Sequence, residues 1–215
     1  MAIKYNIATI LPYKENYTAD GAQAAAIWVA DFYKYSTFKK TNSIYGNTKK
    51  KNYLTKNYTN IEISGLSNML SSSTNEYCKN FIKKIDGKKF DIIEIHNRPH
   101  VFNYLKDKIV SKYILYIHND PLTMSGSKSI NERLNLLNKV DKIVFVSKWV
   151  QSRFFKDIDK KLIYQTEIVY PSIHEEKKNY KKNNNIVFVG KLNISKGYDL
   201  YKDAIIKILD EFKTW

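Results

Sequence analysis

Short apolar runs alternate with helical patterns along most of this chain. The runs are rich in isoleucine, valine, phenylalanine and tyrosine, which is typical of strands buried on both faces of a parallel sheet. They lie at residues 5–11, 90–95, 113–117, 140–146 and 186–189, with weaker strand patterns at 43–45 and 61–63. Helical patterns lie at 22–35, 75–85, 101–105, 130–138, 148–155 and 200–209. This alternation predicts an α/β fold: a Rossmann-like, largely parallel sheet with helices on both faces.

The pattern at residues 22–35 predicts a strong helix because the segment is rich in alanine. Its apolar positions predict burial of Ile27, Ala30, Phe32 and Tyr35. The preceding strand, a loop containing Gly21 and this helix form a first βα unit. No Gly-x-Gly-x-x-Gly occurs, so the dinucleotide fingerprint is absent. Gly21 either lets a backbone amide approach a substrate or simply forms a turn.

A charged, asparagine-rich stretch at residues 175–185 has the composition of a domain linker. We therefore divide the chain into a domain at 1–178 and a second segment at 179–215. The second segment has room for the strand at 186–189 and one helix. The pattern thus predicts an incomplete second Rossmann-like domain.

The composition adds a strong positive charge, +15 over 215 residues. Such a charge fits nucleic acid or an anionic membrane face. Lysines and tyrosines interleave at residues 39–58, which suits single-stranded nucleic acid, a membrane surface or a solvated loop. No known nucleic-acid motif is present, and we favour a general lysine bias as the cause. The single cysteine, Cys78, excludes an internal disulfide and fits a reducing compartment. Neither a secretory signal nor a membrane-spanning apolar run is evident.

A glycine and two lysines follow the apolar run at 186–189. Gly190 ends the run, Lys191 and Lys196 bracket a polar loop, and Gly197 precedes the last helical pattern. Free N–H groups and the helix dipole favour an anion at such a helix start. The same pattern also fits an ordinary strand, loop and helix with solvated lysines.

Polar residues also follow two of the predicted central strands. His96, Arg98 and His100 come after the run at 90–95, and His118 and Asn119 come after the run at 113–117. Strand ends of this kind are where open α/β sheets bind ligands. His96 and His100 are spaced like metal ligands, but Pro99 interrupts the regular helix that would place both on one face. We therefore favour a phosphate or acceptor contact for Arg98 over a metal site.

The segment Val189-Gly190-Lys191-Leu192, followed by Lys196-Gly197, resembles the start of the nucleotide-binding domain of GT-B glycosyltransferases of family 4. In that family a Gly-Arg-Leu segment and a following Lys-Gly supply two cations for the diphosphate of a nucleotide sugar. This chain has Lys191 at the position of the arginine, which keeps the charge and loses the bidentate guanidinium.

Other segments of the chain resemble the same family. The family commonly has Gly-Gly in the loop after the first strand, near donor phosphate and acceptor, where this chain has Asp20-Gly21. A histidine that faces the donor sugar ends the strand that matches residues 113–117, so His118 corresponds to it. Of the family's Pro-Asn-Gly-Val-Asp before the linker only Pro171 is kept, and its Glu-x7-Glu segment is not found here.

The resemblance implies a retaining glycosyltransferase that moves a sugar from a nucleotide-diphosphate sugar to a lipid-linked or polysaccharide acceptor. It implies His118 as the catalytic residue. For the donor diphosphate it implies Lys191, Lys196, Gly21 and Gly190, and for the acceptor or cleft Asp20, Arg98 and Asn119. The reaction is expected to need no metal or other cofactor.

The expected partners are a nucleotide sugar, a lipid-linked or glycan acceptor and an anionic membrane surface, but no nucleic acid. The expected location is the cytoplasm, with peripheral contact to the inner face of the membrane. Two alternatives stay open: a non-catalytic binding module and a basic nucleic-acid-binding protein. Because the sugar-side carboxylates of the family are not found, we expect these 215 residues to turn over no donor by themselves.

Overall fold

The computed structural model describes residues 4–63, 72–172, 181 and 183–213. The chain divides into two compact units, residues 1–172 and 173–215. The predicted boundary between residues 178 and 179 lies outside the described residues.

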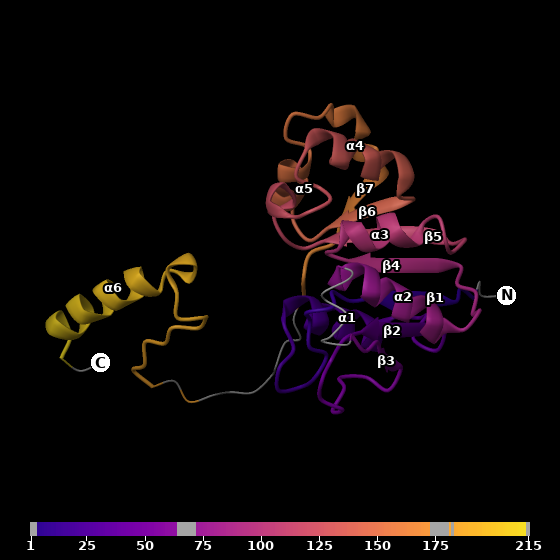
Figure 1. The fold of residues 1–215 in the computed structure, drawn as a ribbon. Helices are drawn as coiled ribbons and strands as arrows, with labels where there is room; N and C mark the ends of the chain where they lie inside the picture. The colour runs from indigo at the N-terminus through magenta and orange to yellow at the C-terminus, as the bar shows by residue number, and fades with distance from the viewer. Residues whose placement is uncertain (1–3, 64–71, 173–180, 182, 214–215) are drawn as a thin grey trace. The chain divides into compact units, whose positions relative to one another are not determined.

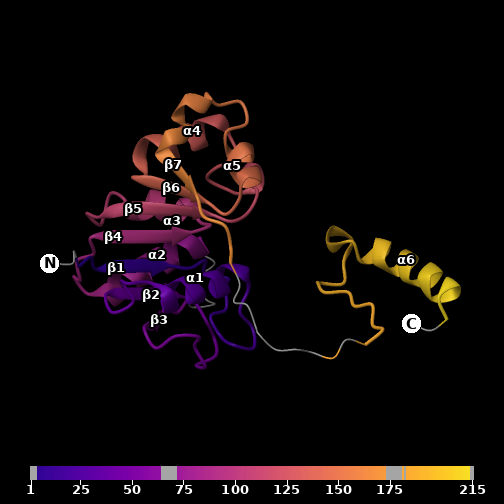
Figure 2. The same ribbon diagram turned by 180° about the vertical axis from the view of Figure 1, so that it is seen from behind.

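Seven parallel strands form one sheet in the first unit, in the order β3-β2-β1-β4-β5-β6-β7 (Figures 1 and 2). The strands are β1 (Ile7–Ile10), β2 (Asn42–Gly46), β3 (Tyr58–Asn60), β4 (Ile92–His96), β5 (Lys112–Ile117), β6 (Lys142–Phe145) and β7 (Thr166–Ile168). This is the predicted Rossmann-like α/β sheet. Because all strands are parallel, their carboxyl ends lie along one edge.

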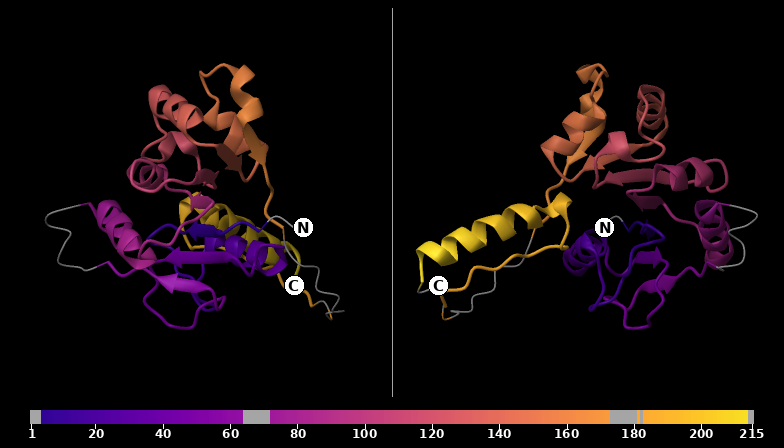
Figure 3. Two further views of the ribbon diagram at one scale, coloured as in Figure 1. Left: turned by 90° about the vertical axis from the view of Figure 1, so that its right-hand side faces the viewer. Right: turned by 60° about the vertical axis from the view of Figure 1, so that its left-hand side comes forward.

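Helices cover both faces of the sheet. They are α1 (Ala24–Tyr35), α2 (Ser73–Ile85), α3 (Pro99–Leu105), α4 (Ile130–Lys139) and α5 (Lys148–Phe154). In Figure 3 the indigo helix α1 and the magenta helix α2 lie on opposite sides of the sheet. The larger core contains apolar residues of α2, α3, α4 and α5, and the smaller core lies under α1.

Side chains alternate between these two cores along the central strands. Ile93 and Ile95 of β4 enter the larger core. Glu94 and His96, on the other face of the same strand, line a cavity together with Trp28 of α1. Strict alternation of this kind is the pattern expected of a pleated strand.

Two sequence predictions in the first unit are wrong in detail. Helix α1 buries Ala25, Ala26, Trp28 and Val29, and it leaves the predicted core residues Ile27, Phe32 and Tyr35 at 49%, 40% and 59% exposure. The helix carries more apolar residues than one face can bury, so tertiary packing chooses the stripe.

The weak strand pattern at residues 61–63 is displaced from the strand that forms. Strand β3 is Tyr58–Asn60, where Tyr58 pairs with Ile44 and is buried in the smaller core. Ile61 follows the strand and packs into the larger core. Ile61 is therefore buried, but at a position beyond the end of the strand.

The second unit contains the helix α6 (Tyr198–Glu211), which follows a 3₁₀ turn at Ile194–Lys196. The predicted strand at 186–189 is not formed: these residues have no regular secondary structure, and no strand of the described residues pairs with them. Phe188 instead packs its ring against Tyr198 and Tyr201. Across both units, none of the helices in the described ranges is long and apolar enough to cross a membrane.

Candidate functional site

The candidate site lies at the carboxyl edge of the two central strands β4 and β5. These strands pair in parallel, with His96 opposite Tyr116. The residues that follow them are therefore neighbours: Asn97 and Arg98 after β4, and His118 and Asn119 after β5. The structure thus brings three sequence-predicted residues, Arg98, His118 and Asn119, to one place.

Asn97 organises this edge, although the sequence pattern alone did not predict a role for it. Its backbone N–H donates to the carbonyl of Tyr116 at 2.7 Å. Its side-chain oxygen accepts from the backbone N–H groups of His118 and Asn119, both at 3.3 Å. The backbone of Asn97 is left-handed, with φ at 57°, a conformation that asparagine tolerates better than most residues. An asparagine directly after a strand and two residues before a proline was the available sequence signal.

His118 forms a hydrogen-bonded pair with His96. Nδ1 of His96 lies 2.9 Å from Nε2 of His118. Burial lowers the pKa of His118 to about 4, and burial followed by the neighbouring His118 holds the pKa of His96 well below its usual value. Both imidazoles are therefore neutral near pH 7, and one proton lies between the two facing nitrogens.

Buried polar groups continue from this pair along the α1 face of the sheet. Glu94 lies 2.6 Å from the hydroxyl of Thr9 and accepts from the hydroxyl of Tyr116 at 3.2 Å. A cavity of about 100 Å³ is lined by Glu94, His96 and Trp28, among others. Burial raises the pKa of Glu94, while the two hydroxyl contacts lower it. The sequence signal for this cluster was the pair of polar residues Glu94 and His96, two positions apart in β4.

Arg98 lies near the carboxylate of Glu15, which the sequence pattern did not predict as part of the site. The guanidinium donates to the carbonyl of Asn97 at 3.0 Å and lies 5.6 Å from the ring centre of Tyr13. Glu15 is buried, 7% exposed, and accepts from the backbone N–H of Ala26 in the first turn of α1. Burial raises the pKa of Glu15, whereas that hydrogen bond and the charge of Arg98 lower it. Glu15 therefore closes the amino end of α1 and adds a negative group near Arg98.

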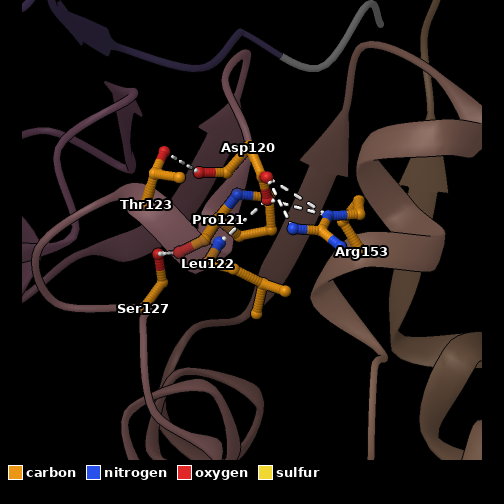
Figure 4. A network of polar contacts seen from close by, with 6 residues as sticks. All are labelled: Asp120, Pro121, Leu122, Thr123, Ser127 and Arg153. Atoms are coloured by element: carbon orange, nitrogen blue, oxygen red, sulfur yellow. Dashed lines mark hydrogen bonds and ion pairs between the residues drawn. The ribbon is translucent and has the colours of Figure 1, made fainter.

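The loop after Asn119 is tied down at both ends (Figure 4). Asp120 accepts from the backbone N–H of Leu122 at 3.0 Å and forms a bidentate pair with Arg153, whose Nη2 lies 2.8 Å from it. Ser127 donates to the carbonyl of Pro121 at 2.8 Å. The loop begins with the 3₁₀ turn Pro121–Thr123 and is anchored to α5 through Arg153.

Asp20 and Gly21 lie in the loop after β1, as predicted, but the contacts given below are with residues outside the candidate site. Asp20 is exposed and forms an ion pair with Lys50 at 2.5 Å. The backbone N–H of Gly21 donates to the carbonyl of Thr18 at 3.2 Å, and its φ is not positive. Within the described residues no hydrogen bond or ion pair joins either residue to Arg98, His118 or Asn119.

The predicted donor residues of the second unit gather in one turn. A Cβ on Gly190 would lie 3.7 Å from Cβ of Lys196, so the two positions are adjacent. Gly197 adopts φ 72° and is the N-cap of α6, where no side chain caps the helix. Lys191 and Lys196 are exposed and form no ion pair with any residue in the described ranges. Asp199 places a negative charge in the same first turn of the helix.

The two histidines spaced like metal ligands have separate partners. His96 pairs with His118, whereas Nε2 of His100 lies 2.7 Å from the hydroxyl of Ser125. Pro99 begins helix α3 and does not interrupt it. Over the part of the chain that the structure describes, no group of three or more histidine, cysteine, aspartate or glutamate residues is placed to hold a metal.

Comparison with known proteins adds one structural likeness. No protein-family model matches the sequence, and no similar sequence is found among curated proteins. The fold is similar to that of Anabaena Alr3699/HepE in complex with UDP and glucose, with a TM-score of 0.48 and 9% sequence identity. The match covers 79% of this chain and 45% of that chain. The chain thus spans less than half the length of that protein.

Proposed function

We propose that this chain is part of a glycosyltransferase that takes a sugar from a nucleotide-diphosphate sugar. The observation that carries the proposal is the turn at Gly190–Gly197, defined here as the lysine turn. Lys191 and Lys196 both belong to this turn, which ends at the uncapped start of α6. Both lysines lack an ion-pair partner among the described residues, so their charges are available to an anion.

A nucleoside diphosphate matches the chemistry of the lysine turn. Its phosphates carry two to three negative charges, and the departing diphosphate needs that charge stabilised as the sugar leaves. Stabilisation of a developing charge by fixed cations and helix N–H groups is usually the largest contribution to such a reaction. Two lysines can supply this without a metal ion, and we propose a metal-independent reaction.

His118 is proposed to contact the sugar that is transferred. Its low pKa keeps the imidazole neutral, so the ring can accept or donate a hydrogen bond to a sugar hydroxyl without competing for the diphosphate charge. Arg98 and Asn119, which share the Asn97 scaffold with His118, are proposed to contact the acceptor. A retaining outcome and a lipid-linked or polysaccharide acceptor complete the proposal, on the basis of the sequence resemblance.

The test is isothermal calorimetry of the 215-residue chain with UDP, GDP, ADP and their sugar conjugates. We expect one of these to bind, and Lys191→Ala or Lys196→Ala to weaken it by about 1.5–3 kcal/mol, because a charge-assisted hydrogen bond is lost. That is roughly a 10- to 150-fold increase in Kd. Lys191→Arg should bind as well as the wild type or better.

Lys207→Ala is the matched control, since it removes the same charge from an exposed position further along α6. It should leave Kd within about twofold. Equal affinity in the wild type and the double alanine variant, or no binding of any nucleotide, contradicts the proposal.

A further inference from the structure

His96 forms a hydrogen bond with one of the two ring nitrogens of His118. The 2.9 Å contact joins Nδ1 of His96 to Nε2 of His118, so Nδ1 of His118 is the nitrogen left for another partner. A single N–H bridges two neutral rings, and its position decides the tautomer of both. If His118 meets a sugar hydroxyl, His96 determines whether Nδ1 accepts or donates the hydrogen bond.

The ring of His96 is held in a fixed orientation. It stacks flat on Tyr116, with centroids 4.5 Å apart and an interplanar angle of 2°. The edge of Trp28 lies against both histidines, with centroid distances of 5.4 Å to His96 and 5.5 Å to His118. His96 is only 1% exposed. These contacts leave the imidazole little freedom to rotate, so the nitrogen facing His118 stays the same.

The cavity behind His96 favours one tautomer. Glu94 and His96 both line it. The carboxylate of Glu94 accepts hydrogen bonds, and about 100 Å³ is enough room for water to join it to a nearby donor. The geometry points to an N–H on Nε2 of His96, the ring nitrogen that does not face His118. Nδ1 of His96 is then an acceptor, and His118 donates its Nε2–H to it.

We propose that His96 is a positioning residue for His118. By accepting Nε2–H of His118, it holds that ring in the tautomer whose Nδ1 carries a free lone pair. His118 then accepts a hydrogen bond from a hydroxyl of the donor sugar. The inference rests on the proposed function for the identity of the ligand, whereas the histidine pair itself is independent of it.

The experiment uses ¹⁵N-histidine-labelled chain of 215 residues and long-range ¹H–¹⁵N correlation spectra of the imidazoles at pH 7. We expect a protonated Nε2 and an unprotonated Nδ1 for His118, with a through-hydrogen-bond coupling between His118 Nε2 and His96 Nδ1. A His118 signal that averages the two tautomers, or that shows Nδ1–H, overturns the proposal.

Two substitutions separate positioning from packing. His96→Asn keeps an amide oxygen where Nδ1 stood, so His118 should retain its tautomer. His96→Leu fills the site without an acceptor, and His118 should change to averaged tautomers. If both variants, or neither of them, shift the nitrogen signals of His118, the role is packing alone. His100→Asn, which alters an exposed histidine, should leave His118 unchanged.

A donor titration distinguishes this inference from the proposed function. With a nucleotide sugar that binds by calorimetry, the His118 Nδ1 signal should move in the wild type and in His96→Asn and should not move in His96→Leu. Absence of any donor binding defeats the proposed function and leaves the tautomer result to stand. Donor binding with an identical His118 signal in all three proteins defeats the inference.

Discussion

At the scale of single residues, the fold controls the charge state of two histidines, His96 and His118. Each lies at or just beyond a strand end, and burial lowers the pKa of both. In the unfolded chain, histidine has a pKa near 6.5. Between that value and about 4, the unfolded state therefore binds a proton at His118 that the folded state does not bind. The contribution of the neutral His118 ring to the unfolding free energy is fully present above pH 6.5. It is lost as the pH falls toward 4.

His118→Asn should consequently flatten the dependence of stability on pH. Between pH 7 and pH 4 the unfolding free energy of both proteins should fall. The fall should be smaller in the variant, by on the order of 3 kcal/mol. Glu94 and Glu15 have raised pKa values and act in the opposite direction, but both are present in both proteins and cancel in the difference. His96 faces His118, and the charge of a protonated His118 lowers the pKa of His96. In His118→Asn the pKa of His96 is therefore lowered less, which increases the difference in pH dependence between the variant and the wild type.

Urea unfolding followed by circular dichroism at pH 7, 6, 5 and 4 measures this difference. His100→Asn controls for the loss of a histidine as such and should follow the wild-type curve. Parallel curves for His118→Asn and the wild type would show that His118 titrates alike in the folded and unfolded states.

At the scale of elements, helix α4 is attached to helix α5 by a buried cation. Arg133 is 2% exposed, and its Nη1 donates to the carbonyls of Phe154 and, at 2.7 Å, Lys156. Phe154 is the last residue of α5 and Lys156 lies two residues beyond it, so the cation is at the carboxyl end of the helix, where the helix dipole also favours a positive charge. The sequence pattern identified both helices and gave no sign of this link, because the partners are backbone atoms more than twenty positions away.

Arg133→Met should lower the unfolding free energy by about 2–4 kcal/mol, since two charge-assisted hydrogen bonds are lost and the carbonyls lose their donors. Arg133→Lys should fall between the wild type and Met. Lys139→Met, an exposed change on the same helix, should stay within about 0.5 kcal/mol of the wild type. Urea unfolding of the three variants tests the link, and a neutral Arg133→Met would show that the cation contributes nothing net.

At the scale of the whole molecule, the two units differ in what holds them. The first unit has a seven-stranded sheet with a core on each face. The second has α6, which buries none of its residues. An isolated helix of about this length is marginal in water. The stability of the molecule therefore resides in residues 1–172.

Amide hydrogen exchange should report this difference directly. We expect strong protection in β1, β4 and β5, and weak protection throughout residues 186–212, because the amides of α6 open without disrupting a core. Mass spectrometry of peptides after timed exchange gives both regions in one experiment. Uniform strong protection across 186–212 would contradict the expectation. Increased protection at 197–201 upon nucleotide addition would agree with the lysine turn as the phosphate site.

The sequence alone was enough to predict the fold class. Apolar runs separated by helical patterns specify buried parallel strands, because both faces of such a strand must be apolar and each crossover needs a helix. A local signal also located one helix start correctly, because Gly197 directly precedes α6. Candidate residues after β4 and β5 followed from the same logic, since strand ends share one edge.

The tertiary structure decided what those residues can do. The surfaces available for packing decide which stripe of α1 is buried. They also decide that residues 186–189 form no strand with any of the described residues. The pairing of His96 with His118 spans 22 positions and arises only when β4 and β5 lie side by side. The neutrality of both rings and the support from Asn97, Glu94 and Trp28 require burial, which a linear pattern does not specify. Chemistry at this edge is thus set by contacts between strands, whereas the order of the elements is set by the local sequence.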